Sequence, residues 1–240
     1  MKSFLTRSRL RDVVLFLCCA SALLRPIGTG GLAVGFALLA IGCALHLVSK
    51  GILVRNTVLC ENGIYGFVRH PYYLSNYVID SAFCVLSGNA YLLLIYPFLF
   101  FWAYGPTMRK EEALLGSLHE AAFARHSTEV PQVFPERASF RHWKSAFEGF
   151  SLTRITWKES GRIARFLSLG FFLLLIHELR ADGLAGLREI IRPTRLDYDE
   201  TLYAALVALL YGASIVLLSR AKKVHDRIKA GEQDAPATRV

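Results

Sequence analysis

The sequence predicts an all-α fold, a polytopic transmembrane helical bundle of about six spans. Of its 240 residues, 53% are hydrophobic. The mean hydropathy is +0.36, whereas apolar residues, even with Gly included, make up only about 45–50% of an ordinary soluble domain. The apolar residues lie in long runs separated by clusters of charge. This pattern is typical of helices that cross a hydrocarbon core about 30 Å thick.

Six apolar runs are candidate spans by their hydropathy. In chain order they are Val13–Leu24, Leu32–Val48, Tyr72–Leu86, Tyr91–Tyr104, Phe166–Ile176 and Leu202–Leu218. The first and the fifth are the shortest runs and fall furthest below the ~20 residues that a helix needs to cross a bilayer. Each of these two must therefore include flanking residues or tilt very little.

Lys and Arg are distributed unequally between the two sides of this bundle. The N-terminus, the segments after the second and fourth spans, and the tail contain 23 of them, whereas the alternate loops contain 5. The positive-inside rule predicts that both termini and both long polar segments are cytoplasmic, and we expect the inner (plasma) membrane. Because no basic stripe with interleaved aromatics lies outside the membrane-flanking positions, we expect no nucleic-acid partner despite the net charge of +9.

The first span has two interpretations. A basic stretch precedes a short apolar run, and Ala20-Ser21-Ala22 resembles a signal-peptide cleavage site. An uncleaved membrane anchor is the favoured alternative. Either way, the later segments keep their predicted sides.

The chain divides into four regions by composition. We expect a core at 1–135, an interfacial amphipathic segment rich in aromatic and basic residues at 136–163, an additional pair of transmembrane helices at 164–220, and a polar tail at 221–240. The five Cys and seven His show no metal-ligand spacing, so no metal site is expected.

The first polar segment runs from Glu61 to Asn76. Gly63 permits a turn that other residues resist, and Pro71 suits the first turn of a helix. Together they predict that the chain turns and then begins a helix where it enters the membrane. Arg69 and His70 are expected at the boundary between membrane and water. Either residue alone is more readily explained as an interfacial side chain with its polar end in water.

Asp80 lies well inside a predicted span. A carboxylate there is unfavourable and implies either a functional site or an interior partner. On a helix, Tyr73, Asn76 and Asp80 fall within about 60° of one another. This polar face is expected to border a pocket or another helix rather than lipid.

The second polar segment begins at Arg109 and continues through Glu111 and Glu112 to Pro135. Its composition is helical. Two acids in the first turn of a cytoplasmic helix are favoured by the helix dipole alone. The segment by itself therefore does not require a functional site.

Taken together, the two segments resemble a family of membrane methyltransferases. The matching residues are Gly63, Tyr65, Arg69, His70, Pro71 and Tyr73, followed by Glu111, Glu112, Leu115, Val130 and Pro131. In this order and spacing, within residues 50–135, they are similar to the family that includes isoprenylcysteine carboxyl methyltransferase and the phospholipid N-methyltransferases. The chain departs from the family pattern at Ser75, where a glycine is usual, and at His119, Glu120, Phe123 and His126.

The resemblance implies that S-adenosylmethionine binds between the two segments, which become cytoplasmic cofactor-binding segments. The implied cofactor-binding residues are Leu59, Cys60, Gly63, Tyr65, His70, Pro71, Tyr72, Tyr73, Glu111 and Glu112. Within this set, Glu112 is expected to hold the methionine ammonium through a charge-assisted hydrogen bond. Asn76 and Arg109 are the implied substrate-binding residues, and Arg109 would orient an anionic group.

The resulting expectation is an S-adenosylmethionine-dependent methyltransferase for a membrane-borne amine, carboxylate or thiol. The candidate catalytic residues are Arg69, His70 and Asp80. A carboxylate acceptor needs no base, whereas an amine or thiol must lose a proton to His70, Asp80 or His126. A membrane scaffold, a transporter subunit and a sterol-type membrane reductase are the alternatives. The sequence does not indicate an oligomeric state.

Overall fold

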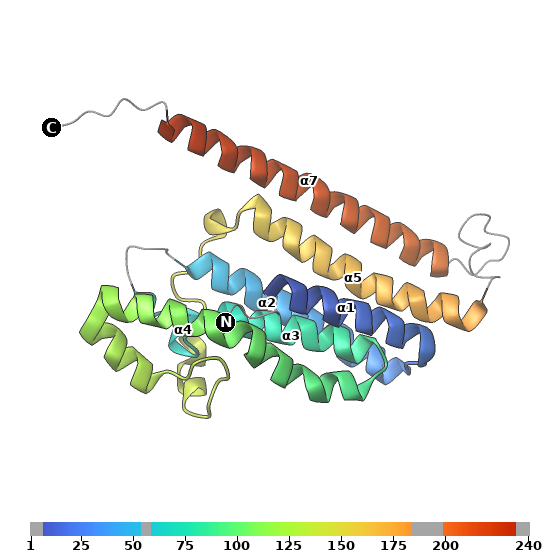
Figure 1. Cartoon of the computed structure of the whole chain (residues 1–240), viewed down its shortest axis with the longest axis horizontal. Helices are drawn as coiled ribbons and strands as arrows, with labels where there is room; N and C mark the ends of the chain where they lie inside the picture. Colours follow the sequence, from blue (N-terminus) through green and yellow to red (C-terminus); the bar gives the residue numbers. More distant parts are fainter. Residues whose placement is uncertain (1–6, 54–58, 184–198, 234–240) are drawn as a thin grey trace.

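The chain forms a bundle of α-helices. The computed structural model describes residues 7–53, 59–183 and 199–233, and contains no strand within these ranges. The described residues form six α-helices, which are α1 Arg7–Leu24, α2 Thr29–Ile52, α3 Pro71–Leu86, α4 Ala90–Glu129, α5 Trp157–Asp182 and α7 Asp199–Gln233 (Figure 1). Three short 3-10 helices join them, namely η1 Gly63–Gly66, η2 Ser139–Ser145 and η3 Leu152–Arg154. The predicted all-α class is confirmed.

Three of the described helices are long and apolar enough to cross a membrane. They are α2, α4 and the first 30 residues of α7. The predicted count of six spans is not confirmed. α3 has only 16 residues, and the first turn of α1 carries Arg7, Arg9 and Arg11. α5 begins and ends among charged side chains. The chain is thus an integral membrane protein by its helices, with three candidate spans.

α2 and α3 pack closely because α2 carries glycines on the face toward α3. A Cβ added at Gly42 would lie 2.6 Å from Ile79 Cγ1 and 3.0 Å from the Ile79 backbone nitrogen. Gly35 faces Leu86 in the same way, one and a half to two turns earlier along α2. Small residues at such positions allow two helix backbones to approach each other in a membrane.

We expect Gly42→Ala to lower the thermal stability of the detergent-solubilised protein. The added methyl group must displace the Ile79 backbone, and overpacking of this kind costs about 1–3 kcal/mol. Gly30→Ala is the matched control in the same helix, since nothing lies within 4 Å of its added Cβ. Equal unfolding temperatures for the two variants would contradict close packing of α2 on α3.

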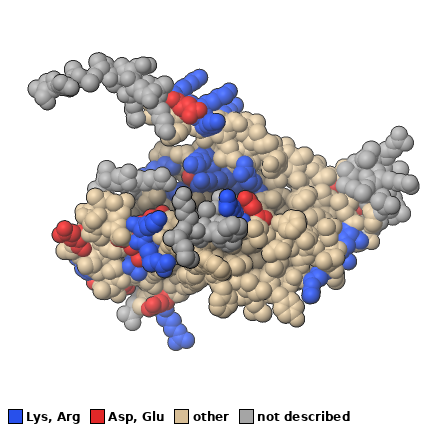
Figure 2. Space-filling model, in the orientation of Figure 1, with Lys and Arg blue, Asp and Glu red and all other residues tan. Residues whose placement is uncertain are grey.

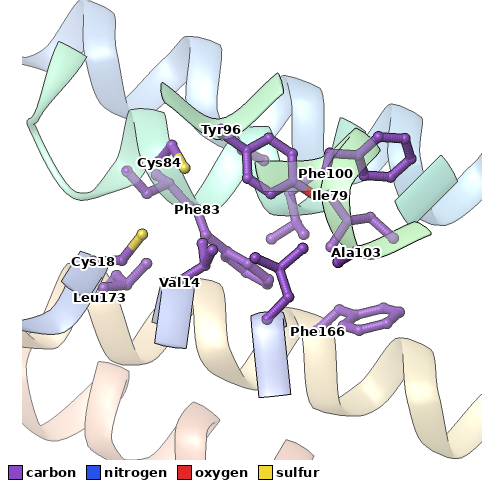
Figure 3. Close-up of a cluster of buried hydrophobic side chains, with 14 of the residues drawn as sticks. Val14, Cys18, Ile79, Phe83, Cys84, Tyr96, Phe100, Ala103, Phe166 and Leu173 are labelled. Atoms are coloured by element: carbon purple, nitrogen blue, oxygen red, sulfur yellow. The ribbon is translucent and has the colours of Figure 1, made fainter. Parts of the chain in front are cut away.

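The larger of two apolar clusters among the described residues joins α1, α2, α3, α4 and α5. Cys18 of α1, Phe83 of α3 and Leu173 of α5 are among its fully buried side chains. In Figure 3 they lie around a shared interior together with aromatic residues of α4. Phe100 and Tyr104 of α4 stack with their ring centroids 4.6 Å apart. α1, despite its charges, is therefore an integral part of the bundle.

The same interior contains a buried ion pair between α1 and α3. Arg11 Nε donates to Asp80 Oδ1 at 2.8 Å, and Arg11 Nη2 donates to Asn76 Oδ1 at 3.1 Å. The Tyr96 hydroxyl of α4 donates to Asp80 Oδ2 at 2.7 Å, and Asp80 is 1% exposed. Of the two interpretations of Asp80, an interior partner is the one that the structure favours.

α7 lies along α5 at the edge of the bundle (Figure 1). Gly161 of α5 faces Leu218 of α7 closely enough that an added Cβ would be 2.9 Å from Leu218 Cγ. The Ser168 hydroxyl donates to the Val207 carbonyl oxygen at 3.1 Å. Leu209 and Ile215 of α7 point outward and are exposed, as expected of a helix that meets lipid.

Candidate active site

A cavity of about 530 Å³ lies where α2 ends, α3 and α5 begin, and the second half of α4 passes. Nine residues singled out from the sequence line it. They are Leu59, Cys60, Tyr65, Arg69, His70, Pro71, Tyr72, Tyr73 and Glu111. The two polar segments, about 40 residues apart in the chain, therefore meet around one space.

Backbone hydrogen bonds hold the first segment against the chain that follows α4. The Arg69 N–H donates to the Pro131 carbonyl at 2.9 Å, and the His70 N–H donates to the Gln132 carbonyl at 3.0 Å. His70 is the N-cap residue of α3, and Pro71 occupies its first turn. These contacts fix the side chains of Arg69 and His70 beside α4.

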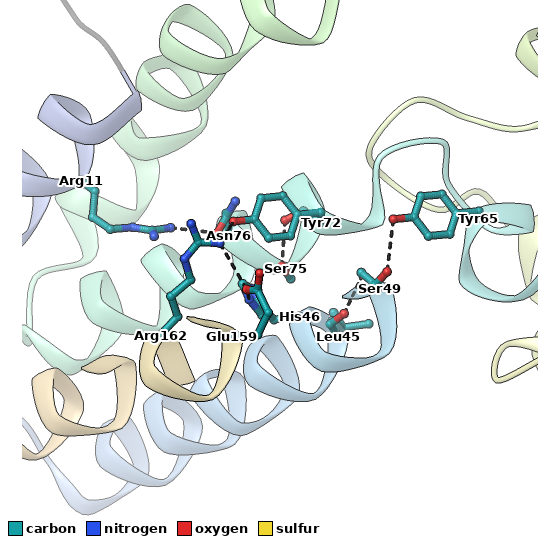
Figure 4. Close-up of polar contacts among 10 residues, drawn as sticks. All are labelled: Arg11, Leu45, His46, Ser49, Tyr65, Tyr72, Ser75, Asn76, Glu159 and Arg162. Carbon is teal, nitrogen blue, oxygen red and sulfur yellow. Dashed lines mark hydrogen bonds and ion pairs between the residues drawn. The ribbon is translucent and has the colours of Figure 1, made fainter. Parts of the chain in front are cut away.

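Tyr65 and Gly63 set the other end of this segment, in η1. Tyr65 is 7% exposed, and its hydroxyl donates to the Ser49 carbonyl of α2 at 3.2 Å (Figure 4). Gly63 has φ +62°, and a Cβ there would lie 2.7 Å from the Glu148 carbonyl oxygen. Gly63 lines a second cavity of about 480 Å³ and not the first. Its contribution to the site is backbone shape.

The two glutamates have different surroundings. Glu112 Oε1 accepts from His70 Nε2 at 3.1 Å and lies 3.3 Å from Arg69 Nη1, while its Oε2 accepts from Gln132 Nε2 at 3.0 Å. Glu111 accepts from the Tyr73 hydroxyl at 2.7 Å, lines the cavity, and has a side chain 47% exposed. Glu112 thus orients Arg69 and His70, and Glu111 is the carboxylate that faces the cavity.

His70 is uncharged at neutral pH. Burial lowers the pKa of His70 below its ordinary value of 6.5, although the nearby Glu112 carboxylate raises it. With Nε2 donating to Glu112, Nδ1 is the nitrogen that lies toward Glu111, 4.0 Å from Glu111 Oε2.

We expect acidification below about pH 6 to weaken S-adenosylmethionine binding, through protonation of His70. The imidazolium adds positive charge beside a cavity that must accept a cationic sulfonium. Because its folded-state pKa is depressed, His70 gains its proton only as the pH falls below 6.5. Titration calorimetry at pH 7.5 and 5.5 measures the change. His119 and His126 also line the cavity, so the test is whether His70→Asn reduces the pH dependence more than His119→Asn does.

Besides the two polar segments, α5 also lines the cavity, and the sequence did not predict this contribution. Lys158, Glu159 and Arg162 line it together with Lys50 of α2. From the sequence, these α5 residues are expected to belong to the interfacial amphipathic segment 136–163. One feature of the sequence could have indicated this contribution. Lys158 and Arg162 have i, i+4 spacing, which places two cations on one face of a helix.

Glu159 of α5 is a fixed anion. Burial by itself would raise its pKa, but the hydrogen bond from His46 and the charges of Arg162 and Lys50 lower the pKa of Glu159 to about 2. His46 Nε2 lies 2.9 Å from Glu159 Oε2, and Arg162 Nη1 lies 3.2 Å from the same oxygen (Figure 4).

Five of the residues predicted for the site do not line this cavity, namely Gly63 and Glu112, described above, and Asn76, Asp80 and Arg109. Asn76 and Asp80 bind Arg11 in the bundle interior. Arg109 is exposed on α4 and is not among the residues that line the cavity. None of the described residues forms a group of His, Cys, Asp or Glu suited to a metal ion.

One comparison with known protein families supports a membrane methyltransferase. Residues 37–117 match the model of the isoprenylcysteine carboxyl methyltransferase (ICMT) family. The matched range runs from the middle of α2 to the second half of α4, and includes the first polar segment and the beginning of the second, with Glu111 and Glu112. No curated protein and no solved structure shows a significant match.

The match covers about a third of the chain and supports a membrane methyltransferase of the isoprenylcysteine carboxyl methyltransferase type. Methyltransferases of this family use S-adenosylmethionine as the methyl donor. This confirms the resemblance found in the sequence. The scaffold, transporter and reductase alternatives receive no support from it.

The residues around the cavity fit this methyl donor. Its volume of about 530 Å³ is within the 300–1,000 Å³ typical of small-molecule sites. Tyr65 and Tyr72 offer aromatic surfaces, and Glu111 offers a carboxylate for an ammonium group. Arg69 Nε is buried and has no hydrogen-bond partner among the described residues, as expected of a donor that awaits an anionic ligand.

Proposed function

We propose that the chain methylates a membrane-borne amine, carboxylate or thiol at the cytoplasmic face of the membrane. The observation that supports this proposal is one cavity lined by residues of both polar segments, of which the first segment and the beginning of the second lie in the range that matches the ICMT family. When bound there, S-adenosylmethionine supplies a methyl group activated by positively charged sulfur. The protein then has to supply mainly proximity and orientation, which can account for roughly 7–11 kcal/mol of a barrier.

The geometry of the charged groups supports a particular set of cofactor contacts. Glu111 binds the methionine ammonium, because it faces the cavity and has one hydrogen bond from Tyr73. Arg69 binds the methionine carboxylate, and Glu112 positions Arg69 and His70. Tyr65, with the backbone of Leu59 and Cys60, lies along the adenosine. This exchanges the roles of the two glutamates relative to the sequence expectation.

His70 is the proposed proton acceptor for an amine or thiol substrate. It is neutral at pH 7, and it lines the cavity. His126 is a second imidazole on the same cavity. Asp80 is not retained in this role, since Arg11 and Tyr96 occupy its carboxylate. A carboxylate substrate is already ionised and needs neither imidazole.

An apolar substrate has a route into the cavity along α4. Leu114, Leu115 and Leu118 line the cavity, and Leu114 and Leu118 are also more than half exposed. A continuous leucine face from the surface to the cavity suits an acyl or prenyl chain, because such a chain leaves lipid without crossing water.

The function is tested by methyl transfer in membranes. Vesicles that contain the protein are incubated with S-adenosylmethionine carrying a trideuterated methyl group, and extracted lipids are analysed by mass spectrometry. We expect a membrane lipid to gain the labelled methyl group with the wild type and not with His70→Ala or Glu111→Ala. Absence of any labelled lipid from vesicles in which the protein binds the cofactor would contradict a membrane-borne substrate.

A further inference from the structure

The second cavity, of about 480 Å³, is not used by the proposed cofactor contacts. Its walls come from three parts of the chain, namely the residues around η1, the end of α4, and the segment from the end of η2 to Glu148. Gly63 lets the first and third parts approach each other, since a Cβ there would lie 2.7 Å from the Glu148 carbonyl oxygen and 3.3 Å from that of Ala146. The cavity is thus built by the fold, and its volume is within the 300–1,000 Å³ typical of small-molecule sites.

The charge of the second cavity is opposite to that of the chain. Lys and Arg outnumber Asp and Glu by 28 to 19, and Figure 2 shows Lys and Arg side chains gathered over the region where α5 begins. Three carboxylates line the second cavity, one from each wall, together with one guanidinium, that of Arg125. The carboxylates are those of Glu61, Glu129 and Glu148. With an uncharged imidazole at His126, these groups leave a net charge of −2.

Arg125 neutralises these carboxylates only in part. Its Nη2 lies 3.5 Å from Glu61 Oε2, and the two side chains are 65% and 33% exposed. Ion pairs between such exposed groups are weak, because water competes for both partners. The other oxygen, Glu61 Oε1, is buried and has no hydrogen-bond partner among the described residues. This oxygen is therefore available to accept a hydrogen bond from a ligand.

His126 adds a buried ring to the second cavity. His126 is only 6% exposed, and its ring makes no hydrogen bond within the described part of the chain. It lines both cavities and so belongs to the wall between them. An uncharged imidazole has one nitrogen that accepts a hydrogen bond, and a buried polar group without a partner is unfavourable. The ring therefore indicates that a hydrogen-bond donor binds beside it.

The lining of the second cavity selects among cationic ligands. Among the described residues that line it, none is Phe, Tyr or Trp, so a quaternary ammonium would lack the aromatic faces that bind it. Val130 is the one apolar side chain among them, which disfavours a lipid chain. The described residues include no group of His, Cys, Asp or Glu suited to a metal ion. Primary ammonium groups, each with three N–H donors, match carboxylates that come from separate walls.

We propose that the second cavity binds a soluble aliphatic diamine, with its ammonium groups held by the three carboxylates and by the ring of His126. The site is separate from the cofactor cavity, so the proposal goes beyond the proposed function and does not depend on it. Each contact between an ammonium and a carboxylate is a charge-assisted hydrogen bond. Two ammonium groups balance the net charge of the cavity. Because Glu129 and Glu148 are exposed, salt should weaken the binding.

Binding of 1,4-diaminobutane to the full-length protein tests the proposal. The protein in neutral-lipid nanodiscs is titrated calorimetrically with 1,4-diaminobutane, butylamine, tetramethylammonium and magnesium ions at one ionic strength. We expect the diamine to bind at least tenfold more tightly than each of the other three, because only the diamine makes a second charge-assisted contact through N–H donors. An affinity for butylamine, tetramethylammonium or magnesium equal to that for the diamine would overturn the proposal.

Variants of the carboxylates locate the bound diamine. Glu129→Gln is expected to weaken binding of 1,4-diaminobutane at least fivefold and to leave the Kd for S-adenosylmethionine within twofold of the wild type. Glu61→Gln should weaken binding of the diamine in the same way. Glu136→Gln is the matched control, because Glu136 is exposed and does not line the cavity. Unchanged affinity for the diamine in folded Glu129→Gln and Glu61→Gln variants would overturn the proposal.

The cofactor cavity is the competing place for an ammonium group, since Glu111 lines it. The titration is therefore repeated with saturating S-adenosylmethionine and with Glu111→Gln. We expect the affinity for 1,4-diaminobutane to stay within threefold of the first value in both cases. Loss of diamine binding in either case would assign the probe to the cofactor cavity and overturn the second site. If the wild type does not bind S-adenosylmethionine, the proposed function is contradicted, and Glu111→Gln alone decides between the two cavities.

Discussion

Asp80→Ala is expected to destabilise the protein more than any other single change considered above. The substitution leaves the Arg11 guanidinium in the bundle interior without its carboxylate, and removes the acceptor of the Tyr96 hydroxyl. Loss of one partner from a buried ion pair costs about 3–5 kcal/mol. The loss should appear as a large drop in the unfolding temperature in detergent, with or without cofactor.

Paired substitutions distinguish a structural ion pair from a catalytic acid. Arg11→Met with Asp80→Leu removes both charges, and we expect the double variant to recover most of the lost stability. It should also keep the affinity for S-adenosylmethionine, because neither residue lines the cavity. Asp12→Ala, an exposed acid of α1, is the control. If Asp80→Ala unfolds at the wild-type temperature yet abolishes methyl transfer, Asp80 is catalytic and the structural assignment is wrong.

Glu111→Gln is expected to weaken S-adenosylmethionine binding by about 10–100-fold. The amide keeps the shape of the side chain and can still accept from Tyr73, but it loses the negative charge that pairs with the ammonium. A hydrogen bond to a charged group contributes about 1.5–3 kcal/mol, which corresponds to that range. Calorimetric titration measures the Kd directly.

Glu112→Gln is the matched variant one residue along. Since Glu112 holds Arg69, His70 and Gln132 and does not line the cavity, we expect a lower unfolding temperature and a smaller change in Kd than for Glu111→Gln. The opposite order, with near-normal affinity in Glu111→Gln and strong loss in Glu112→Gln, would restore Glu112 as the ammonium ligand.

The local parts of the site were predictable because their signals are local. Pro71 marks the start of α3, and Gly63 marks a turn, which has the expected positive φ. The order Arg69-His70-Pro71 and then Glu111-Glu112 gave the family and the cofactor, and residues from both groups line one cavity.

The tertiary partners were not predictable from one sequence. Asp80 carried the signal of a buried charge, but nothing near it in the chain indicates Arg11, which is 69 residues away. Arg11 instead counted as a cytoplasmic flanking charge. The contribution of α5 to the cavity is equally non-local, since Glu159 and His46 are 113 residues apart.

The roles of Glu111 and Glu112 show a limit of motif reasoning. Two adjacent acids on a helix point about 100° apart, so only one of them can face a given cavity. The family resemblance implies only that a carboxylate of this pair faces the cofactor. The rotation of α4 and the position of Gln132 decide which one, and both depend on packing.

The predicted number of membrane spans differs from the three candidate spans among the described helices for a physical reason. Hydropathy identifies apolar runs, but a run of 16 residues such as α3 is too short for a bilayer and can instead be buried among other helices. Gly35 and Gly42 of α2 and the interior ion pair show that α3 is a central helix of the bundle, packed against protein on several sides.

The central claim is that S-adenosylmethionine occupies the cavity between the two polar segments. Ultraviolet crosslinking of radiolabelled S-adenosylmethionine to the purified protein, followed by peptide mapping, tests it most directly. The account predicts saturable label in the peptides that contain Tyr65, Tyr72, Tyr73 or Phe123, all of which line the cavity, and loss of that label with excess unlabelled cofactor. Saturable label confined to α7, or no saturable label on a folded protein, would contradict it.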